Sequence, residues 1–146
     1  MPEVEILLGS KSDLPHAEKC ATMLARFGIS SEVHVASAHR NPDRVETIVK
    51  GSDAQVFIAM AGMAAALPGV VAARTLKPVI GVPLSGKVPF DSLLSIAQMP
   101  RGVPVATVAV DGAENAALLA AEILAMRLPQ ILEKLRAYRA EWDRET

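Results

Sequence analysis

The chain has 146 residues, 51% of them hydrophobic, and a formal net charge of −1. These values exclude a disordered chain and predict a single domain over residues 1–146, while the lack of a large basic block argues against nucleic-acid binding. No apolar run approaches the roughly 18 residues of a membrane span, and the N-terminus lacks the pattern of a secretory signal. We therefore expect a cytoplasmic protein with no membrane partner.

The first half of the chain alternates short apolar runs with amphipathic segments. The apolar runs predict strands over residues 4–8, 31–36 and 54–60. Helical spacing between the first two runs predicts a helix that Ser12 or Asp13 caps and that Gly28 ends. Cys20, the only cysteine, lies in its apolar stripe and is expected in the core. A lone cysteine also excludes an intrachain disulfide and a cysteine-based zinc cluster.

The rest of the chain continues the alternation. Asn41 as N-cap and Pro42 at the first helical position begin a second helix, which Gly51 ends. Further helices are predicted over residues 67–74, 91–98 and 113–126, strands over 78–82 and 103–110, and a loop over 83–89. Pro129 then breaks or restarts the last helix.

The alternation of five strands with helices indicates an α/β fold, a three-layer αβα sandwich built on an open parallel sheet. The almost unbroken apolar run over residues 54–60 is typical of a parallel strand that is covered on both faces. Spacing alone does not fix the strand order, and we select the flavodoxin-like order 2-1-3-4-5.

The C-terminal segment, about residues 128–143, has one apolar and one charged face. The apolar stripe comprises Leu128, Ile131, Leu132, Leu135, Tyr138 and Trp142. Such a helix folds back on its own domain or packs on another subunit, and the stripe itself does not name the partner.

Ligands of open α/β sheets bind at the carboxyl ends of the strands, where three unusual loops fall in this sequence. The first, residues 9–13, offers a glycine turn, the hydroxyls of Ser10 and Ser12, and free amides at a helix start. These groups suit a phosphate or a sugar hydroxyl. The alternative is an ordinary helix-capping turn, because Ser and Asp13 are common there.

The second loop, Ser37 to Arg40, places a histidine and an arginine at a strand end. Arg40 can bind a phosphate through two parallel hydrogen bonds, and His39 can exchange a proton near neutral pH. The alternative is a solvated surface loop. His16 and His34 are both expected to be plain surface residues.

The third loop, residues 61–69, has no titratable side chain and provides backbone amides and small side chains. It suits a pocket for a flat ligand, or else close packing of a helix on the sheet. Asp91 as an N-cap and Arg101 as an anion contact are weaker candidates. Because dinucleotide, Walker, nucleophile-elbow and metal-ligand patterns are missing, the residues predict a metal-free acid–base enzyme or a binder of a small phosphorylated ligand.

Several motifs, taken together and in order, carry a resemblance to the PurE family. They are Gly-Ser-Lys-Ser-Asp at 9–13, Ser-Ala-His-Arg at 37–40 followed by Asn-Pro-Asp, Ala-Ala-Ala-Leu-Pro-Gly at 64–69, Asp-Ser-Leu-Leu-Ser-Ile at 91–96, the stretch 98–105, and the helix 114–121. Each motif alone is a weak signal. The set, in this order, covers nearly the whole chain and is specific to the family that the chain resembles.

The resemblance implies a flavodoxin-like fold, a cytoplasmic homo-octamer to which the C-terminal helix contributes, and no cofactor or metal. It further implies N5-carboxyaminoimidazole ribonucleotide (N5-CAIR) mutase activity in de novo purine synthesis. In that reaction the carboxylate leaves N5 as carbon dioxide, stays trapped, and is captured at C4 to give 4-carboxyaminoimidazole ribonucleotide (CAIR). His39 would be the catalytic proton shuttle.

The same resemblance implies the substrate-binding residues. Ser10, Asp13 and Arg40 would hold the ribose and phosphate. The remaining residues would line the site or pack the base and carboxylate: Ser12, Ser37, Ala38, Gly62, Met63, Ala64 and Leu67.

Two features depart from the family pattern. Ala66 replaces a family histidine, and the loop over residues 84–90 is about two residues shorter than in the mutases. The second class of the family, which carboxylates aminoimidazole ribonucleotide (AIR) directly with carbon dioxide, also lacks that histidine but has lysine where Arg40 stands. We favour the mutase, with AIR carboxylase, a non-catalytic nucleotide-binding module and a paralogue with a changed substrate as alternatives.

Overall fold

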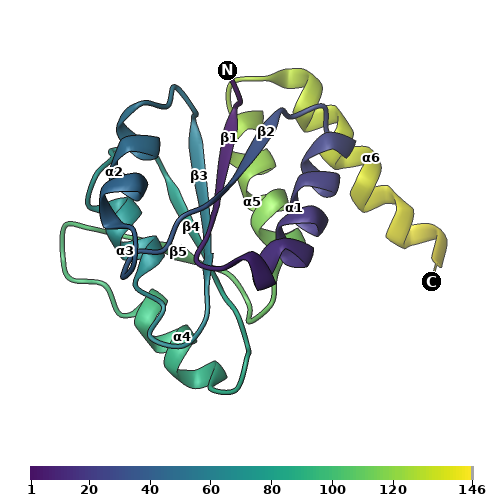
Figure 1. The fold of residues 1–146 in the computed structure, drawn as a ribbon. Coiled ribbons are helices and arrows are strands. Elements are labelled where there is room, and N and C mark those ends of the chain that lie inside the picture. The colour runs from purple at the N-terminus through teal and green to yellow at the C-terminus, as the bar shows by residue number, and fades with distance from the viewer. Residues whose placement is uncertain (146) are drawn as a thin grey trace.

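The structure is a computed structural model that describes residues 1–145. A five-stranded parallel sheet in the order β2-β1-β3-β4-β5 forms its centre (Figure 1). The strands are β1 (Val4–Leu8), β2 (Ser31–Val35), β3 (Val56–Ala61), β4 (Val79–Pro83) and β5 (Ala106–Thr107). The predicted flavodoxin-like strand order is therefore confirmed.

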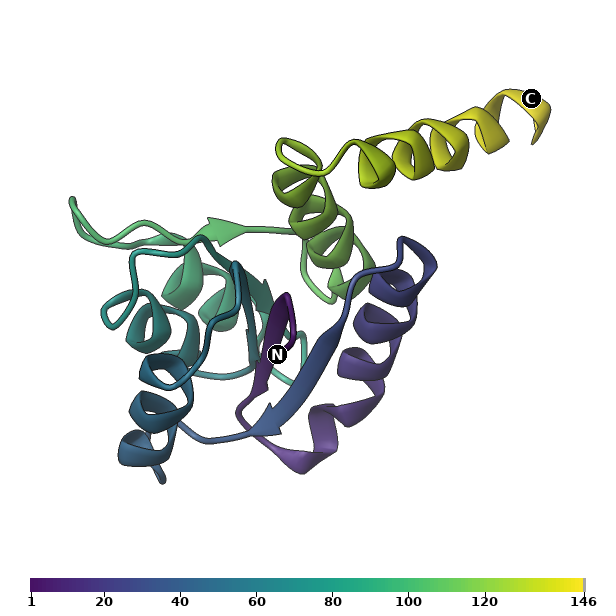
Figure 2. The ribbon, with the colours of Figure 1, turned by 90° about the horizontal axis from the view of Figure 1, so that it is seen from above.

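Helices cover both faces of the sheet and complete the three predicted layers (Figure 2). The helical elements are η1 (Lys11–Asp13), α1 (Leu14–Arg26), α2 (Pro42–Lys50), α3 (Leu67–Ala72), α4 (Pro89–Ala97), α5 (Ala113–Ala125) and α6 (Pro129–Glu145). α1 and α5 lie on one face, and α2, α3 and α4 lie on the other. Within the described residues, no helix has the length and apolar character to cross a membrane.

The continuous apolar sequence of β3 follows from its central position between two cores. Val56, Ile58 and Met60 point into the core under α1 and α5. Phe57 and Ala59 point into the core under α2 and α3. Successive side chains of a strand alternate between faces, so a strand covered on both sides needs apolar residues at every position.

The strand at the β5 edge is shorter than predicted. Only Ala106 and Thr107 pair with β4, whereas the sequence predicted a strand over 103–110. Pro104 has no N–H to donate to a ladder. The chain still follows β4 beyond the strand, since the Val108 N–H donates to the Gly81 carbonyl at 3.1 Å.

Two helix starts also differ from the prediction. α4 begins at Pro89 rather than Asp91, because proline suits the first turn of a helix. The 3-10 turn η1 separates the first loop from α1, which begins at Leu14. Neither Asp13 nor Asn41 makes a side-chain capping bond, although each stands at an N-cap.

Cys20 is fully buried, as predicted, and burial raises the pKa of its thiol to about 12. The prediction for His34 was wrong. Its Nε2 lies 2.6 Å from Oε2 of Glu5, a carboxylate that is only 4% exposed. The Ser52 hydroxyl donates to the other Glu5 oxygen at 2.9 Å. A buried carboxylate needs such partners. Because the other residues of β1 are apolar, the sequence pattern did not indicate that His34 would pair with a buried Glu5.

The sequence indicated no metal-ligand cluster, yet the fold brings one trio of suitable groups together. Glu5, Glu32 and His34 have ligand atoms within 4.8 Å of one another. Both Glu5 oxygens already have protein partners. Glu5 and His34 therefore form a buried polar pair, with the exposed Glu32 beside them.

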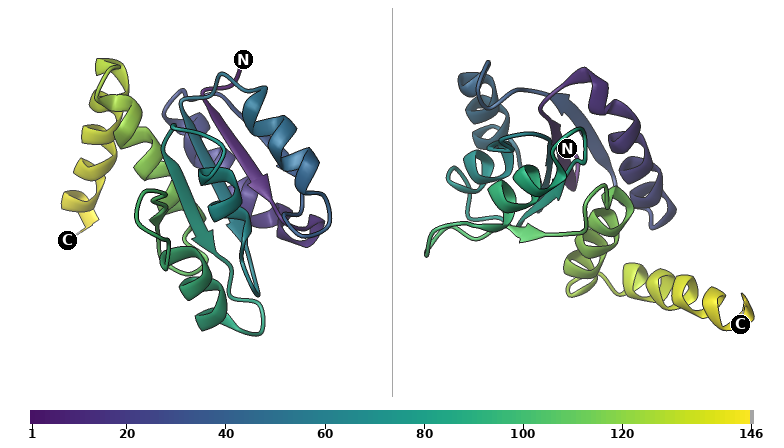
Figure 3. Two further views of the ribbon diagram at one scale, coloured as in Figure 1. Left: turned by 90° about the vertical axis from the view of Figure 1, so that its left-hand side faces the viewer. Right: turned by 90° about the horizontal axis from the view of Figure 1, so that it is seen from below.

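α6 packs on its own chain from Ile131 to Glu141. Ile131 and Leu135 are buried in the core under α1 and α5. Tyr138 meets Phe27 edge-on at 5.8 Å between ring centroids, and Glu141 forms an ion pair with Arg26. Beyond these contacts the helix extends away from the sheet (Figure 3).

Candidate active site

The three loops singled out in the sequence start at the same level of the sheet. Leu8 of β1 is paired with both Val35 of β2 and Met60 of β3. The first residue after a strand still forms a hydrogen bond with the neighbouring strand. The Ala36 N–H donates to the Leu8 carbonyl at 2.8 Å, and the Gly9 N–H donates to the Met60 carbonyl at 3.3 Å. Parallel strands therefore deliver all three loops to one edge, the lower edge in Figure 1.

Between these loops lies a cleft of about 610 Å³. Every residue predicted for the site lines it: Ser10, Ser12, Asp13, Ser37, Ala38, His39, Arg40, Gly62, Met63, Ala64 and Leu67. The fold thus brings together three segments that lie far apart in the chain, while the predicted weaker candidates Asp91 and Arg101 do not line this cleft.

The first loop is stiffened by its own hydroxyls. Ser10 Oγ accepts the Ser12 N–H at 3.3 Å and lies 3.0 Å from Ser12 Oγ. Partial burial raises the pKa of Asp13, and the positive charge of His16 and a backbone hydrogen bond from Ser10 oppose that rise. Asp13 is therefore a carboxyl group partly withdrawn from water at the cleft wall.

The second loop forms a tight turn that presents its two functional side chains. Ser37 closes the turn, because its Oγ accepts the Arg40 N–H at 3.1 Å and its carbonyl accepts the Asn41 N–H at 2.8 Å. Arg40 reaches toward the first loop, with Nη2 3.5 Å from the Gly9 carbonyl. His39 is exposed in the cleft.

A polar recess of about 410 Å³ continues the cleft past Arg40. Its wall includes Lys11, Ser10, Ser37 and Arg40. Two cations beside hydroxyls and backbone amides form an environment suited to a phosphate group.

The third loop contributes shape and no titratable group. Met63 adopts a left-handed backbone conformation with φ 54° and its side chain is 72% exposed. A side chain at Gly62 would contact the Leu84 carbonyl oxygen at 3.6 Å, so the loop after β3 packs closely against the loop after β4. Ala66 lines the cleft without offering a polar side chain.

Three residues that line the cleft were not predicted from the sequence: His16, Leu84 and Gly86. His16 was predicted to be a plain surface residue, but it is half-buried on the cleft wall. Its spacing of three residues from Asp13 was the available signal, because residues three apart on a helix share a face.

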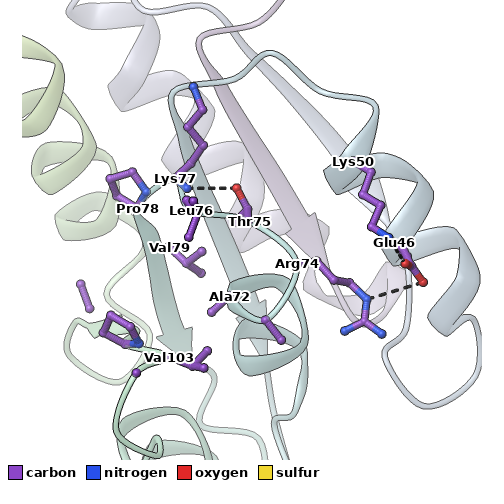
Figure 4. A pocket seen from close by; sticks show the side chains of 14 residues that line it. Glu46, Lys50, Ala72, Arg74, Thr75, Leu76, Lys77, Pro78, Val79 and Val103 are labelled. Atoms are coloured by element: carbon purple, nitrogen blue, oxygen red, sulfur yellow. Dashed lines mark hydrogen bonds and ion pairs between the residues drawn. The ribbon is translucent and has the colours of Figure 1, made fainter.

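A larger cavity, about 990 Å³, lies away from these loops, beside α2, α3 and the start of β4 (Figure 4). Its charged groups are largely satisfied by one another. Glu46 forms an ion pair with Lys50 and a longer one, 3.7 Å, with Arg74. The hydrogen bond and charge of Lys50, aided by Arg74, lower the pKa of Glu46. The chemistry-bearing loops are thus at the smaller cleft.

Comparison with known proteins gives the family. The sequence profile described as AIR carboxylase matches residues 3–145. The chain belongs to this family. The N5-carboxyaminoimidazole ribonucleotide mutase of Methanocaldococcus jannaschii is 56% identical over 141 residues, covering 96% of this chain and 90% of that protein. The corresponding mutase of Thermotoga maritima is 49% identical, covering 99% and 88%.

Solved structures share this fold. The crystal structure of Treponema denticola PurE superposes with a TM-score of 0.91 at 33% identity, covering 99% of this chain and 94% of that one. The resemblance drawn from the ordered motifs is therefore confirmed, and so is the fold that it implied.

Proposed function

We propose that this chain is an N5-CAIR mutase, which moves a carboxyl group from N5 to C4 of aminoimidazole ribonucleotide in purine synthesis. The observation that carries the proposal is the cleft, where one exposed imidazole stands beside an arginine-lined recess and a wall of small residues. The two archaeal and bacterial relatives compared above, which are named as mutases, support the same assignment.

The substrate binds with its 5′-phosphate in the recess, where Arg40, Ser10 and backbone amides bind it. Asp13 holds the ribose hydroxyls, while Ser12, Ser37 and Ala38 line the site. The flat imidazole then lies against Gly62, Met63, Ala64 and Leu67. This orientation directs the exocyclic nitrogen and C4 toward His39.

His39 carries a single proton through both halves of the reaction. As the N5–carboxyl bond breaks, its electron pair returns to the aminoimidazole, carbon dioxide is released, and the His39 imidazolium donates a proton to N5. C4 then attacks carbon dioxide, and neutral His39 removes the C4 proton, which restores the aromatic ring and the imidazolium. Protons and charge balance over the cycle, so one histidine suffices.

Carbon dioxide must remain beside the ring between the two steps. A closely fitting wall serves this purpose, because a retained reactant is captured at a high effective concentration. We further propose that the protein is a cytoplasmic homo-octamer and that α6 packs on a neighbouring subunit. The 77% exposed Phe90, the 54% exposed Leu94 and the extended end of α6 support an assembly that covers them.

AIR carboxylase is the second candidate, and two observations favour it. Ala66 offers no polar side chain where the mutase pattern has a histidine, and the loop between β4 and α4 is short. A non-catalytic nucleotide-binding module is the third, and the exposed His39 argues against it, because binding alone requires no proton shuttle.

The deciding experiment measures CAIR formation by the purified protein with EDTA present and ATP absent. One assay supplies N5-CAIR at low bicarbonate, and the other supplies AIR with excess bicarbonate. Turnover of N5-CAIR alone supports the mutase, and efficient use of AIR assigns the carboxylase. Binding of both nucleotides without turnover of either would leave the binding module.

A further inference from the structure

The connection between β4 and α4 forms part of the cleft wall, although it is only residues 84–88. Leu84 and Gly86 line the cleft, and the Leu84 carbonyl faces Gly62 of the opposite loop. A shift of this connection would change the shape of the space that receives the migrating carboxyl group.

The two ends of the connection are fixed by the core. The Leu84 N–H donates to the Ala61 carbonyl at 2.9 Å. The Ser92 hydroxyl, fully buried, donates to the Leu84 carbonyl at 2.8 Å and to the Pro89 carbonyl at 3.0 Å. These bonds hold the ends and leave the path of the residues between them to other contacts.

Asp111, from the loop after β5, supplies the contact in between. Its Oδ1 accepts the Ser85 N–H at 2.9 Å, and its own N–H donates to the Pro83 carbonyl at 2.8 Å. Its backbone is left-handed, with φ 59°, a conformation that costs most residues energy and that Asp, Asn and Gly tolerate. Gly86, which follows Ser85 in the chain, also has a positive φ, and a side chain there would meet nothing within 4 Å.

Two residues of α1 act on Asp111 electrostatically. Partial burial acts to raise the pKa of the Asp111 carboxyl, but the hydrogen bonds from Ser85, aided by the charges of His16 and Lys19, lower it. His16 itself lines the cleft. The hydrogen bond to Ser85 is thus the contact by which Asp111 acts on the connection.

We propose that Asp111 is a positioning residue for carboxyl transfer: by holding Ser85, it sets the place of Gly86, next to the fixed Leu84, against the bound aminoimidazole. This inference rests on the proposed function, since the effect expected is on the transfer reaction. A misplacement of about 1 Å in a site is enough to lower turnover by about 10²-fold. Because both ends of the connection stay fixed, we expect the loss of one contact between them to displace it by less.

The test compares two substitutions that differ in one property. Asp111→Asn keeps the acceptor oxygen and tolerates the left-handed backbone, whereas Asp111→Gly keeps the backbone and removes the acceptor. We expect kcat for N5-CAIR to fall about 10-fold in Asp111→Gly, with KM changed less than about 3-fold, and both constants to stay within about 2-fold of wild type in Asp111→Asn. Glu114→Gln, an exposed carboxylate nearby, serves as the control for loss of charge.

A second readout makes the result independent of catalysis. Hydrogen exchange of the Ser85 amide in the free protein should be at least about 10-fold faster in Asp111→Gly and unchanged in Asp111→Asn. If wild type turns over neither nucleotide, the proposed function fails, and the Ser85 exchange rates alone then show whether Asp111 holds the connection. Wild-type kinetics and wild-type Ser85 exchange in Asp111→Gly, or equal losses in both variants, would overturn the inference.

Discussion

His34 and His39 are close together in the sequence and lie in opposite surroundings. His34 is on β2 with its ring against the buried Glu5. His39 lies past the end of the same strand, exposed in the cleft, and within residues 1–145 it has no side-chain hydrogen bond or ion pair. The first imidazole satisfies a buried charge, and the second is free to exchange a proton. Residue type is the same, so position on the sheet decides the role.

The largest effect is expected at the exposed histidine. His39→Asn removes the proton shuttle and keeps a side chain of similar polarity, so kcat for N5-CAIR should fall by at least about 10²-fold. The melting temperature should stay within about 1 °C of wild type, because the side chain has no partner to lose. Steady-state assays and thermal unfolding of the same preparation measure both. Normal turnover would contradict the mechanism.

The buried histidine should give the reverse pattern. His34→Ala leaves the Glu5 carboxylate buried with only Ser52 as its partner, which should lower the free energy of unfolding by about 3 kcal/mol. Urea denaturation measures this loss, and kcat of the folded variant should be unchanged. Glu32→Gln is the matched control, because Glu32 is 58% exposed and 4.0 Å from His34, so its loss should cost under about 0.5 kcal/mol. An equal loss in both variants would show that Glu5 does not depend on His34.

Arg40 tests how the phosphate is held. Arg40→Lys keeps the charge and loses the planar pair of donors, so KM should rise about 10-fold while kcat changes little. Titration with AIR by calorimetry should give the same loss of affinity. An unchanged affinity would place the phosphate elsewhere in the cleft.

The contrast between the two histidines also shows which features of the structure can be predicted from the sequence. The strands follow from apolar periodicity, and the place of the cleft loops follows from the rule that parallel strands deliver their ends to one edge. The strand order was not fixed by spacing and was selected as the flavodoxin-like one. His16 and His34 were misplaced, because exposure depends on which neighbouring element covers a side chain. The path of residues 84–88 depends on Asp111, a contact 26 positions away from Ser85, and local patterns carry no signal of it.

The smallest effect is expected at Asp13, the carboxyl group on the cleft wall. Burial raises its pKa above the ordinary value of 3.8, so the folded protein binds its proton more tightly than the unfolded chain does. The stability that follows from this is present below pH 3.8 and is lost as pH rises through the folded pKa. At pH 7 the ionised Asp13 therefore costs a little stability, reduced by its partial exposure to solvent.

Asp13→Asn should consequently raise the melting temperature by about 1 °C at pH 7 and leave it unchanged near pH 3, because asparagine is neutral at both and is an equally good N-cap. Turnover of N5-CAIR should fall at the same time if Asp13 holds the ribose. Binding sites commonly show this relation, in which a substitution that raises stability lowers activity. Thermal unfolding at the two pH values measures the difference. A melting temperature lowered at pH 7 would mean instead that the charge stabilises the start of α1 by more than burial costs it.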